Sequence, residues 1–121
     1  MKRRATVILR KEKSILFTQE KNGQWLLPGG KVEKNELPIC AAVRELWEET
    51  GLVAESIRFM FSHQSYSNNH SVFLVSVSEE AHVLARNEVA LVKWLTPDEY
   101  FHIKLTPATE KILDIASKMA D

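Results

Sequence analysis

The chain has 121 residues, which is enough for one domain with a hydrophobic core and leaves little room for a second. Lysine and arginine together number 16, as do aspartate and glutamate, so the formal net charge is zero and a nucleic-acid polymer is not expected as a partner. The apolar segments are too short to span a membrane. Cys40 is the only cysteine, so an intramolecular disulfide is excluded and a reducing, cytoplasmic location is expected.

The first predicted elements are two short strands. Apolar and β-branched runs at residues 5–10 and 14–18, separated by charged residues, predict a hairpin. Asn22-Gly23 predicts a turn, and Pro28-Gly29-Gly30 predicts a stronger break in the chain. The basic residues ahead of the hairpin, Lys2 to Arg4, are expected to be solvated.

A helix is predicted next, over residues 38–50, because Pro38 suits a first helical position and Gly51 suits the residue after the end. A last amphipathic helix is predicted to begin at Thr106-Pro107. The length indicates one domain, residues 1–121. Strands and helices do not alternate strictly, which indicates the α/β (α+β) class with a mixed sheet covered by helices. Three further strands are predicted, at residues 52–61, 71–78 and 89–95.

The predicted helix has an acidic face. Glu45, Glu48 and Glu49 stand at positions i, i+3 and i+4, so their side chains share one side of the helix. Like charges at this spacing repel by roughly 0.2–0.5 kcal/mol a pair, and a hard divalent cation such as Mg²⁺ removes that repulsion. A solvated acidic surface is the alternative explanation. A separate apolar stripe is expected to face the core: Ile39, Ala42, Val43, Leu46 and Thr50.

A longer motif surrounds this helix. From Gly30 the sequence follows G-x5-E-x7-R-E-L-x-E-E-x-G-L, through Glu36 and Arg44 to Leu52. This pattern is similar to the Nudix box at every specified position, and a chance match is on the order of one in ten million. The chain therefore resembles the Nudix hydrolases, with the box at residues 30–52, and it is most similar to the short MutT-type members.

The resemblance implies a fold and a metal. Nudix domains are α/β/α sandwiches with a mixed β-sheet, in which the box forms a loop, a helix and a loop. In the family the box glutamates bind Mg²⁺ or Mn²⁺, which carries over to Glu45, Glu48 and Glu49. The residue before the first box glycine often adds its carbonyl oxygen, and here that residue is Gly29. Two successive glycines also permit a close approach of the backbone.

The resemblance also implies supporting and catalytic roles. The box arginine, Arg44, is expected to orient a metal-binding carboxylate by pairing with Glu36 or Glu48, which makes Glu36 a support and not a ligand. A simple surface pair between Arg44 and Glu48 is the alternative. A further acid ahead of a late strand often completes the family site, and Glu88 fits that place as a metal ligand or as the general base. Two neighbouring acids are alternatives that suit turn caps better: Glu79 and Glu80.

Four residues are candidates for contacts with the substrate. Lys31 can touch a phosphate or remain solvated, Trp25 can stack on a base or pack in the core, and Tyr66 can stack or stay solvated in its loop. Thr109 stands where MutT-type sanitisers carry a base-reading asparagine, and Glu20 stands where they carry an arginine, so 8-oxo-dGTP is not expected to be selected. The histidines show no metal-ligand spacing and are expected at the surface: His63, His70, His82 and His102.

The resemblance implies a Mg²⁺-dependent hydrolase that cleaves a diphosphate linkage in a nucleoside triphosphate or another nucleoside diphosphate derivative, as a nucleotide-pool sanitiser does. Two alternatives remain: a hydrolase of dinucleoside polyphosphates, and a non-catalytic nucleotide-binding sensor. The intact box argues against the sensor, because degenerate family members typically lose a box glutamate. The expected partner is a small nucleotide, and the protein is expected to act as a monomer or homodimer away from membranes.

Overall fold

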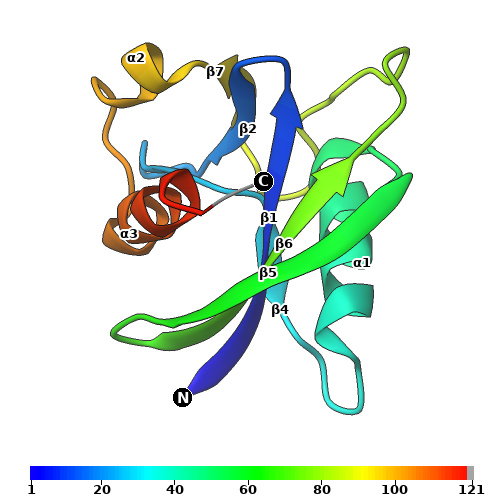
Figure 1. The fold of residues 1–121 in the computed structure, drawn as a ribbon. Helices are drawn as coiled ribbons and strands as arrows, with labels where there is room; N and C mark the ends of the chain where they lie inside the picture. Colours follow the sequence, from blue (N-terminus) through cyan, green and yellow to red (C-terminus); the bar gives the residue numbers. More distant parts are fainter. Residues whose placement is uncertain (120–121) are drawn as a thin grey trace.

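The computed structural model describes residues 1–119, which form one mixed β-sheet flanked by helices (Figure 1). The predicted helix at 38–50 and the predicted first hairpin are confirmed. No helix within residues 1–119 is long and apolar enough to cross a membrane. In chain order the elements are β1 (Lys2–Lys11), β2 (Ser14–Gln19), β3 (Trp25–Leu26), β4 (Gly29–Lys31), α1 (Pro38–Thr50), β5 (Ser56–Gln64), β6 (Asn68–Ser76), β7 (Leu91–Leu95), α2 (Pro97–Tyr100) and α3 (Pro107–Ser117).

Strand β1 is the centre of the sheet, whose main strand order is β3-β2-β1-β6-β5. It runs parallel to β6, from Lys2 opposite Asn68 to Leu9 opposite Val75, and antiparallel to β2 and β4. Strand β7 pairs antiparallel with β2 outside this path. Parallel and antiparallel pairs therefore coexist, which confirms the expected mixed sheet.

The two faces of β1 explain the layers of the fold. Side chains alternate across a strand, so Ala5, Val7 and Leu9 enter one core together with Leu46 of α1. Helices α1 and α3 lie on opposite faces of the sheet (Figure 1), and the α/β/α sandwich is confirmed. Ile8 points to the second core, where it packs with buried residues of α3: Ile112, Leu113 and Ala116.

Several predicted boundaries are wrong. The break expected at Pro28-Gly29-Gly30 contains a strand, because β4 pairs with β1 and places Gly30 opposite Ala5. An apolar run predicts that a strand exists, whereas pairing with its neighbours decides where the strand ends. The strands expected at 52–61, 71–78 and 89–95 accordingly occupy Ser56–Gln64, Asn68–Ser76 and Leu91–Leu95.

The buried stripe of α1 also differs from the expected one. Ile39 and Val43 are 38% and 37% exposed, whereas Ala41 is fully buried. The face that packs on the sheet is therefore rotated toward Ala41, which is the side of the helix that also carries carboxylates. The confirmed members of the stripe are Ala42, Leu46 and Thr50.

His70 is buried, so its expected surface position is wrong. It is 4% exposed in β6, and its Nδ1 lies 2.9 Å from the Thr6 hydroxyl of β1. Its Nε2 lies 3.2 Å from the Ser65 hydroxyl, so both ring nitrogens have hydrogen-bond partners. Burial above all, and then the charges of Arg4 and His63, lower the pKa of His70 to about 4. The fold therefore stabilises the neutral ring.

The buried His70 predicts sensitivity to acid. Its pKa falls from 6.5 to about 4 on folding, so its contribution to stability is complete above pH 6.5 and is lost as the pH falls toward 4. The loss is on the order of 1–3 kcal/mol. We expect the free energy of unfolding, measured by urea titration, to fall less steeply in this window for His70→Gln than for the wild type. The exposed His102→Gln is the control, and equal slopes in all three proteins would contradict the expectation.

Candidate active site

Two of the expected metal ligands lie on the buried side of α1. At about 100° per residue, Glu45 and Glu49 fall between Ala41 and Ala42 around the helix, and both alanines are fully buried. The Glu45 side chain is accordingly 17% exposed, against 34% for Glu48 at the edge of this face. The acidic face and the core-facing side therefore overlap, although the sequence pattern indicated two separate faces.

Strand β4 approaches this side of the helix. The backbone N–H of Gly29 donates a hydrogen bond to Oε1 of Glu49 at 3.1 Å. A Cβ atom at Gly30 would stand 2.1 Å from Oε2 of Glu45, and one at Gly29 would stand 2.1 Å from the Ala5 carbonyl oxygen. The φ of Gly29 is also +150°, which L side chains rarely adopt. Glycines at both positions therefore allow α1 and β1 to come this close to β4.

Burial changes the protonation of Glu49. It raises the pKa of this carboxyl to about 7, against the opposing effects of the Gly29 hydrogen bond and the positive charge of Arg4. The charges of Glu45 and Glu48 raise the pKa further. A divalent cation bound beside these groups would stabilise the ionised form that burial disfavours. The electrostatics of the cluster therefore suit a metal ion.

Arg44 ties the box carboxylates together. Its Nε and Nη2 donate to the two oxygens of Glu36 at 2.8 and 2.9 Å, and its Nη1 donates to Glu45 at 2.6 Å and to Glu48 at 2.9 Å. Nη2 also donates to the Lys31 carbonyl at 3.0 Å. The bidentate contact with Arg44 lowers the pKa of Glu36 to about 2. Arg44 thus engages both carboxylates named for it, and a simple surface pair with Glu48 describes only one of its contacts.

The expected ligands do not converge on one point in these side-chain conformations. Among residues 1–119 there is no group of three His, Cys, Asp or Glu side chains arranged to hold a metal ion. Arg44 engages Oε1 of both Glu45 and Glu48, and Gly29 engages Oε1 of Glu49. Each carboxylate has a second oxygen, the donor type that Mg²⁺ and Mn²⁺ prefer. The residues present therefore fit such an ion by the chemistry of their oxygens and by their shared position on α1.

Glu88 lies in a turn next to the C-terminal end of α1. Its side chain is exposed, and the preceding Asn87 donates from its amide to the Glu48 carbonyl at 2.9 Å. This contact ties the Glu88 turn to the helix that carries the box glutamates. The two alternative acids occupy an earlier turn of the same loop: Glu79 and Glu80.

A cavity of about 340 Å³ brings together residues from the two ends of the chain. Arg4, expected in a solvated terminus, lines it from β1, donates to the Leu27 carbonyl at 3.3 Å and interacts electrostatically with Glu49. Tyr66 and Thr109 line the same cavity. Tyr66 is fully exposed, whereas Thr109 is 4% exposed. The cavity therefore connects two candidate substrate residues with a cation that the sequence pattern missed.

Two other candidate contact residues do not line this cavity. Trp25 is 7% exposed and packs in the core with Phe17 and Ile112. Its ring is therefore not available to stack on a base, and it occupies the core position that was its alternative. Lys31 is exposed at the end of β4, and its backbone carbonyl accepts a hydrogen bond from Arg44.

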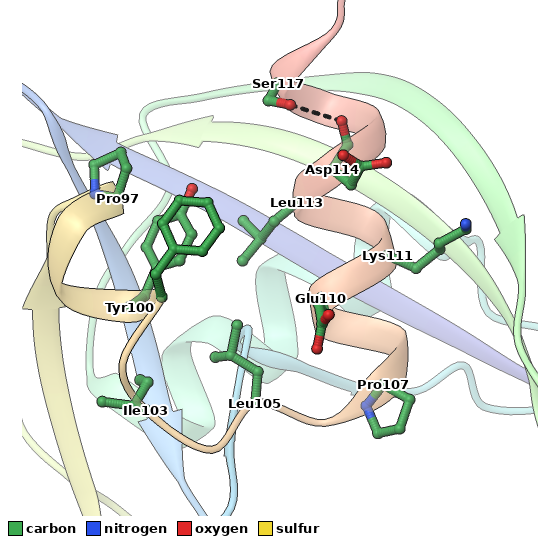
Figure 2. Close-up of a pocket in the computed structure, with 11 residues that line it drawn as sticks. Pro97, Tyr100, Ile103, Leu105, Pro107, Glu110, Lys111, Leu113, Asp114 and Ser117 are labelled. Carbon is green, nitrogen blue, oxygen red and sulfur yellow. Dashed lines mark hydrogen bonds between the residues drawn. The ribbon is translucent and has the colours of Figure 1, made fainter.

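A larger hollow of about 650 Å³ lies between α2 and α3 (Figure 2). Its walls include Tyr100, Ile103, Leu105 and Leu113, which Figure 2 shows around the opening. No residue of the segment 30–52 lines it. The position of the acidic residues on α1, and not the size of a hollow, therefore identifies the candidate active site.

A family profile described as "NUDIX domain" matches residues 1–115 of the chain. The chain belongs to the Nudix hydrolase family. Membership agrees with the spacing from Gly30 to Leu52 and with the sandwich fold. The expected relationship to Nudix hydrolases is therefore confirmed.

Curated relatives of this Nudix domain include MutT-like proteins. A MutT-like protein of Streptomyces ambofaciens is 32% identical over 97 residues, which cover 78% of this chain and 63% of that protein. The chain therefore spans less than two thirds of that relative. The CTP pyrophosphohydrolase of Escherichia coli (strain K12) is 31% identical over 114 residues, which cover 88% of this chain and 84% of that protein. Among solved structures, a nudix hydrolase family member from Chromobacterium violaceum is 30% identical with a TM-score of 0.86, covering 98% of this chain and 77% of that one.

Gly30→Ala tests the contact between β4 and α1 in this Nudix domain. The new Cβ would meet the carboxyl end of Glu45 at 2.1 Å, and that flexible side chain can move away. We expect the variant to fold with a loss of about 1–3 kcal/mol and to bind Mn²⁺ about tenfold more weakly in calorimetry, because Glu45, an expected ligand, is displaced. Gly29→Ala, which meets the Ala5 backbone, is expected to lose more stability. Wild-type Mn²⁺ affinity in Gly30→Ala would contradict this account.

Proposed function

We propose that this Nudix hydrolase uses Mg²⁺ or Mn²⁺ to cleave a diphosphate linkage in a nucleoside triphosphate or a related nucleoside diphosphate derivative. One observation supports the proposal most: Glu45 and Glu49 lie against the Gly29-Gly30 backbone, and Glu48 stands at the edge of the same face of α1. Carboxylates held in this way offer hard oxygen donors to a cation that phosphates also bind. Membership of the family supports the reaction class.

We assign the metal to the three box glutamates, the Gly29 carbonyl and Glu88. A bound ion would neutralise charge on the phosphates and lower the pKa of an attacking water. Arg44 orients two of the box glutamates, Glu45 and Glu48, and Glu36 in turn holds the Arg44 guanidinium. Glu88 is the proposed acid that completes the metal site or accepts the proton of the water.

We place the nucleoside part of the substrate in the 340 Å³ cavity. Arg4 supplies positive charge there, Tyr66 an exposed ring and Thr109 a hydroxyl group. Lys31, exposed beside the box, is proposed to contact a phosphate. The similarity to the CTP pyrophosphohydrolase supports a nucleoside triphosphate as substrate. We propose nucleotide-pool sanitation in the cytoplasm, by a monomer or homodimer, as the setting of the reaction.

Glu49→Gln tests the metal centre. The change keeps the size of the side chain and removes its charge, so the fold is expected to survive while hydrolysis falls at least about 100-fold. Turnover of a panel of nucleoside triphosphates is measured with Mg²⁺, with Mn²⁺ and in excess chelator, as pyrophosphate release against phosphate release. Glu55→Gln, at an exposed position ahead of β5, is the control. Full activity in excess chelator, or full activity of the Glu49→Gln variant, would contradict the metal mechanism.

Thr109 predicts weak selection of an oxidised guanine. Its hydroxyl is hydrogen-bonded to the Thr106 hydroxyl at 2.7 Å and offers less recognition of a base edge than an asparagine amide. Glu20, also in the cavity wall, adds no positive charge. We expect kcat/KM for 8-oxo-dGTP to exceed that for dGTP by roughly tenfold or less, the effect of one hydrogen bond. A ratio of about a thousand or more at the same Mg²⁺ concentration would mean that another residue reads the base.

A further inference from the structure

The C-terminal end of α1 is closed by residues 84–88 of the following loop, which we call the strap. A helix normally leaves its last four carbonyls without intrahelical partners. The strap backbone meets two of them, because the Leu84 N–H donates to the Thr50 carbonyl at 3.0 Å and the Arg86 N–H donates to the Glu49 carbonyl at 2.9 Å. The strap backbone is therefore hydrogen-bonded to the helix turn that carries the acidic cluster.

Two side chains of the strap bind the same helix end. The Asn87 amide donates to the Glu48 carbonyl at 2.9 Å, and Arg86 donates from Nη1 to the Trp47 carbonyl at 3.3 Å. The Arg86 guanidinium also stacks 4.5 Å from the centre of the Trp47 ring. Asn87 has a φ of 57°, a left-handed conformation that asparagine tolerates better than most residues. Every carbonyl from residue 47 to residue 50 thus has a partner in the strap.

The strap is also fixed at its other end. The Val89 N–H closes a turn onto the carbonyl three residues earlier, at 3.1 Å. The next N–H, that of Ala90, donates to the Gln19 carbonyl of β2 at 2.9 Å. The backbone at Glu88 is therefore held between α1 and β2, although the Glu88 side chain itself is exposed.

We propose that Asn87 and Arg86 are positioning residues for Glu88. By tying the strap to the carbonyls of Trp47 and Glu48, they hold Glu88 at the metal-binding end of α1. This inference rests on the proposed function of Glu88 as a metal ligand. The contacts that carry it use helix backbone oxygens, so they do not occupy the box carboxylates. The Asn87 and Arg86 contacts thereby set the separation between the loop acid and the helix acids.

A strap that only stabilised the helix end would have a different signature. Its loss would lower the midpoint of thermal unfolding and leave the affinity of the folded protein for a metal unchanged. Its effect would also be the same whether or not residue 88 carried a carboxylate. Metal affinity in the presence and absence of Glu88 therefore distinguishes positioning from simple stabilisation.

A double-mutant cycle on Mn²⁺ binding provides this test. Asn87→Gly removes the amide and keeps the left-handed backbone accessible, and Glu88→Gln removes the carboxylate. Calorimetry with Mn²⁺ alone measures the wild type, both single variants and the double variant. Each single change is expected to weaken Mn²⁺ binding about tenfold. The double variant is expected to be no weaker than Glu88→Gln, because Asn87 acts through Glu88.

Asn22→Gly is the matched control, because Asn22 also serves an exposed turn, where its side chain accepts a hydrogen bond from the Gln24 N–H at 3.0 Å. It is expected to leave the Mn²⁺ affinity unchanged. Arg86→Lys is the second strap variant, since lysine keeps the charge and loses the planar stack. It is expected to show a smaller loss of affinity that also disappears in the Glu88→Gln background, and it covers the case in which Asn87→Gly does not fold.

Losses that multiply in the double variant would overturn the proposal, as would wild-type Mn²⁺ affinity in Asn87→Gly or in Glu88→Gln. The proposed reaction fails separately. Coupled losses of Mn²⁺ affinity in a protein that hydrolyses no nucleotide would contradict the proposed reaction and would still support the strap assignment. Nucleotide hydrolysis together with uncoupled Mn²⁺ affinities would contradict only the strap assignment.

Discussion

The candidate site depends on one close contact, between a glycine strand and a helix face that carries carboxylates. Glu45 and Glu49 lie on the side of α1 that turns to the sheet, where a carboxylate loses hydration. Gly29 offsets part of that loss with a hydrogen bond, and Gly30 leaves the space that the Glu45 carboxyl occupies. Arg44 compensates the charge from the outer side of the cluster. The close contact between β4 and α1 is therefore the common cause of the packing of the helix and of the properties of its acids.

Much of this arrangement could be predicted from the spacing of one motif. The spacing indicated the helix and the acids that share its side, because these residues are separated by fixed numbers of helical positions. The pairing of Arg44 with Glu36 or Glu48 was expected from the resemblance to the family, since Glu36 lies ahead of the helix. The direction in which the helix faces the sheet could not be predicted. Periodicity gives the relative directions of side chains, and Ile39 and Val43 look more suited to a core than Ala41 does. Strand β4 lies instead against the side with the acids, where Gly30 leaves space for the Glu45 carboxyl and the Gly29 N–H binds Glu49.

Arg4 and His70 could not be placed from the sequence for a different reason. They lie opposite each other across the parallel pair of β1 and β6, so each owes its environment to a strand from the other half of the chain. Nothing local distinguishes Arg4 from its solvated basic neighbours, or His70 from a loop histidine. Alternation along β1 places Arg4 on the same face as Thr6 and Ile8 only when the strand is known to begin at Lys2. Pairing with the parallel partner strand then completes the environments of Arg4 and His70, and parallel pairing leaves no turn signal in the sequence.

The central position of β1 also has a consequence for the order of assembly. During synthesis β1 and β2 can join as soon as both have been made, but the parallel edge of β1 stays open until β6 follows. Closing so long a loop costs entropy before the pairing compensates it, which slows folding. An open edge in that interval is a template for strands of other chains. Because both cores lie on β1 and β6, neither the layer of α1 nor that of α3 can complete its packing before β6 has joined the sheet.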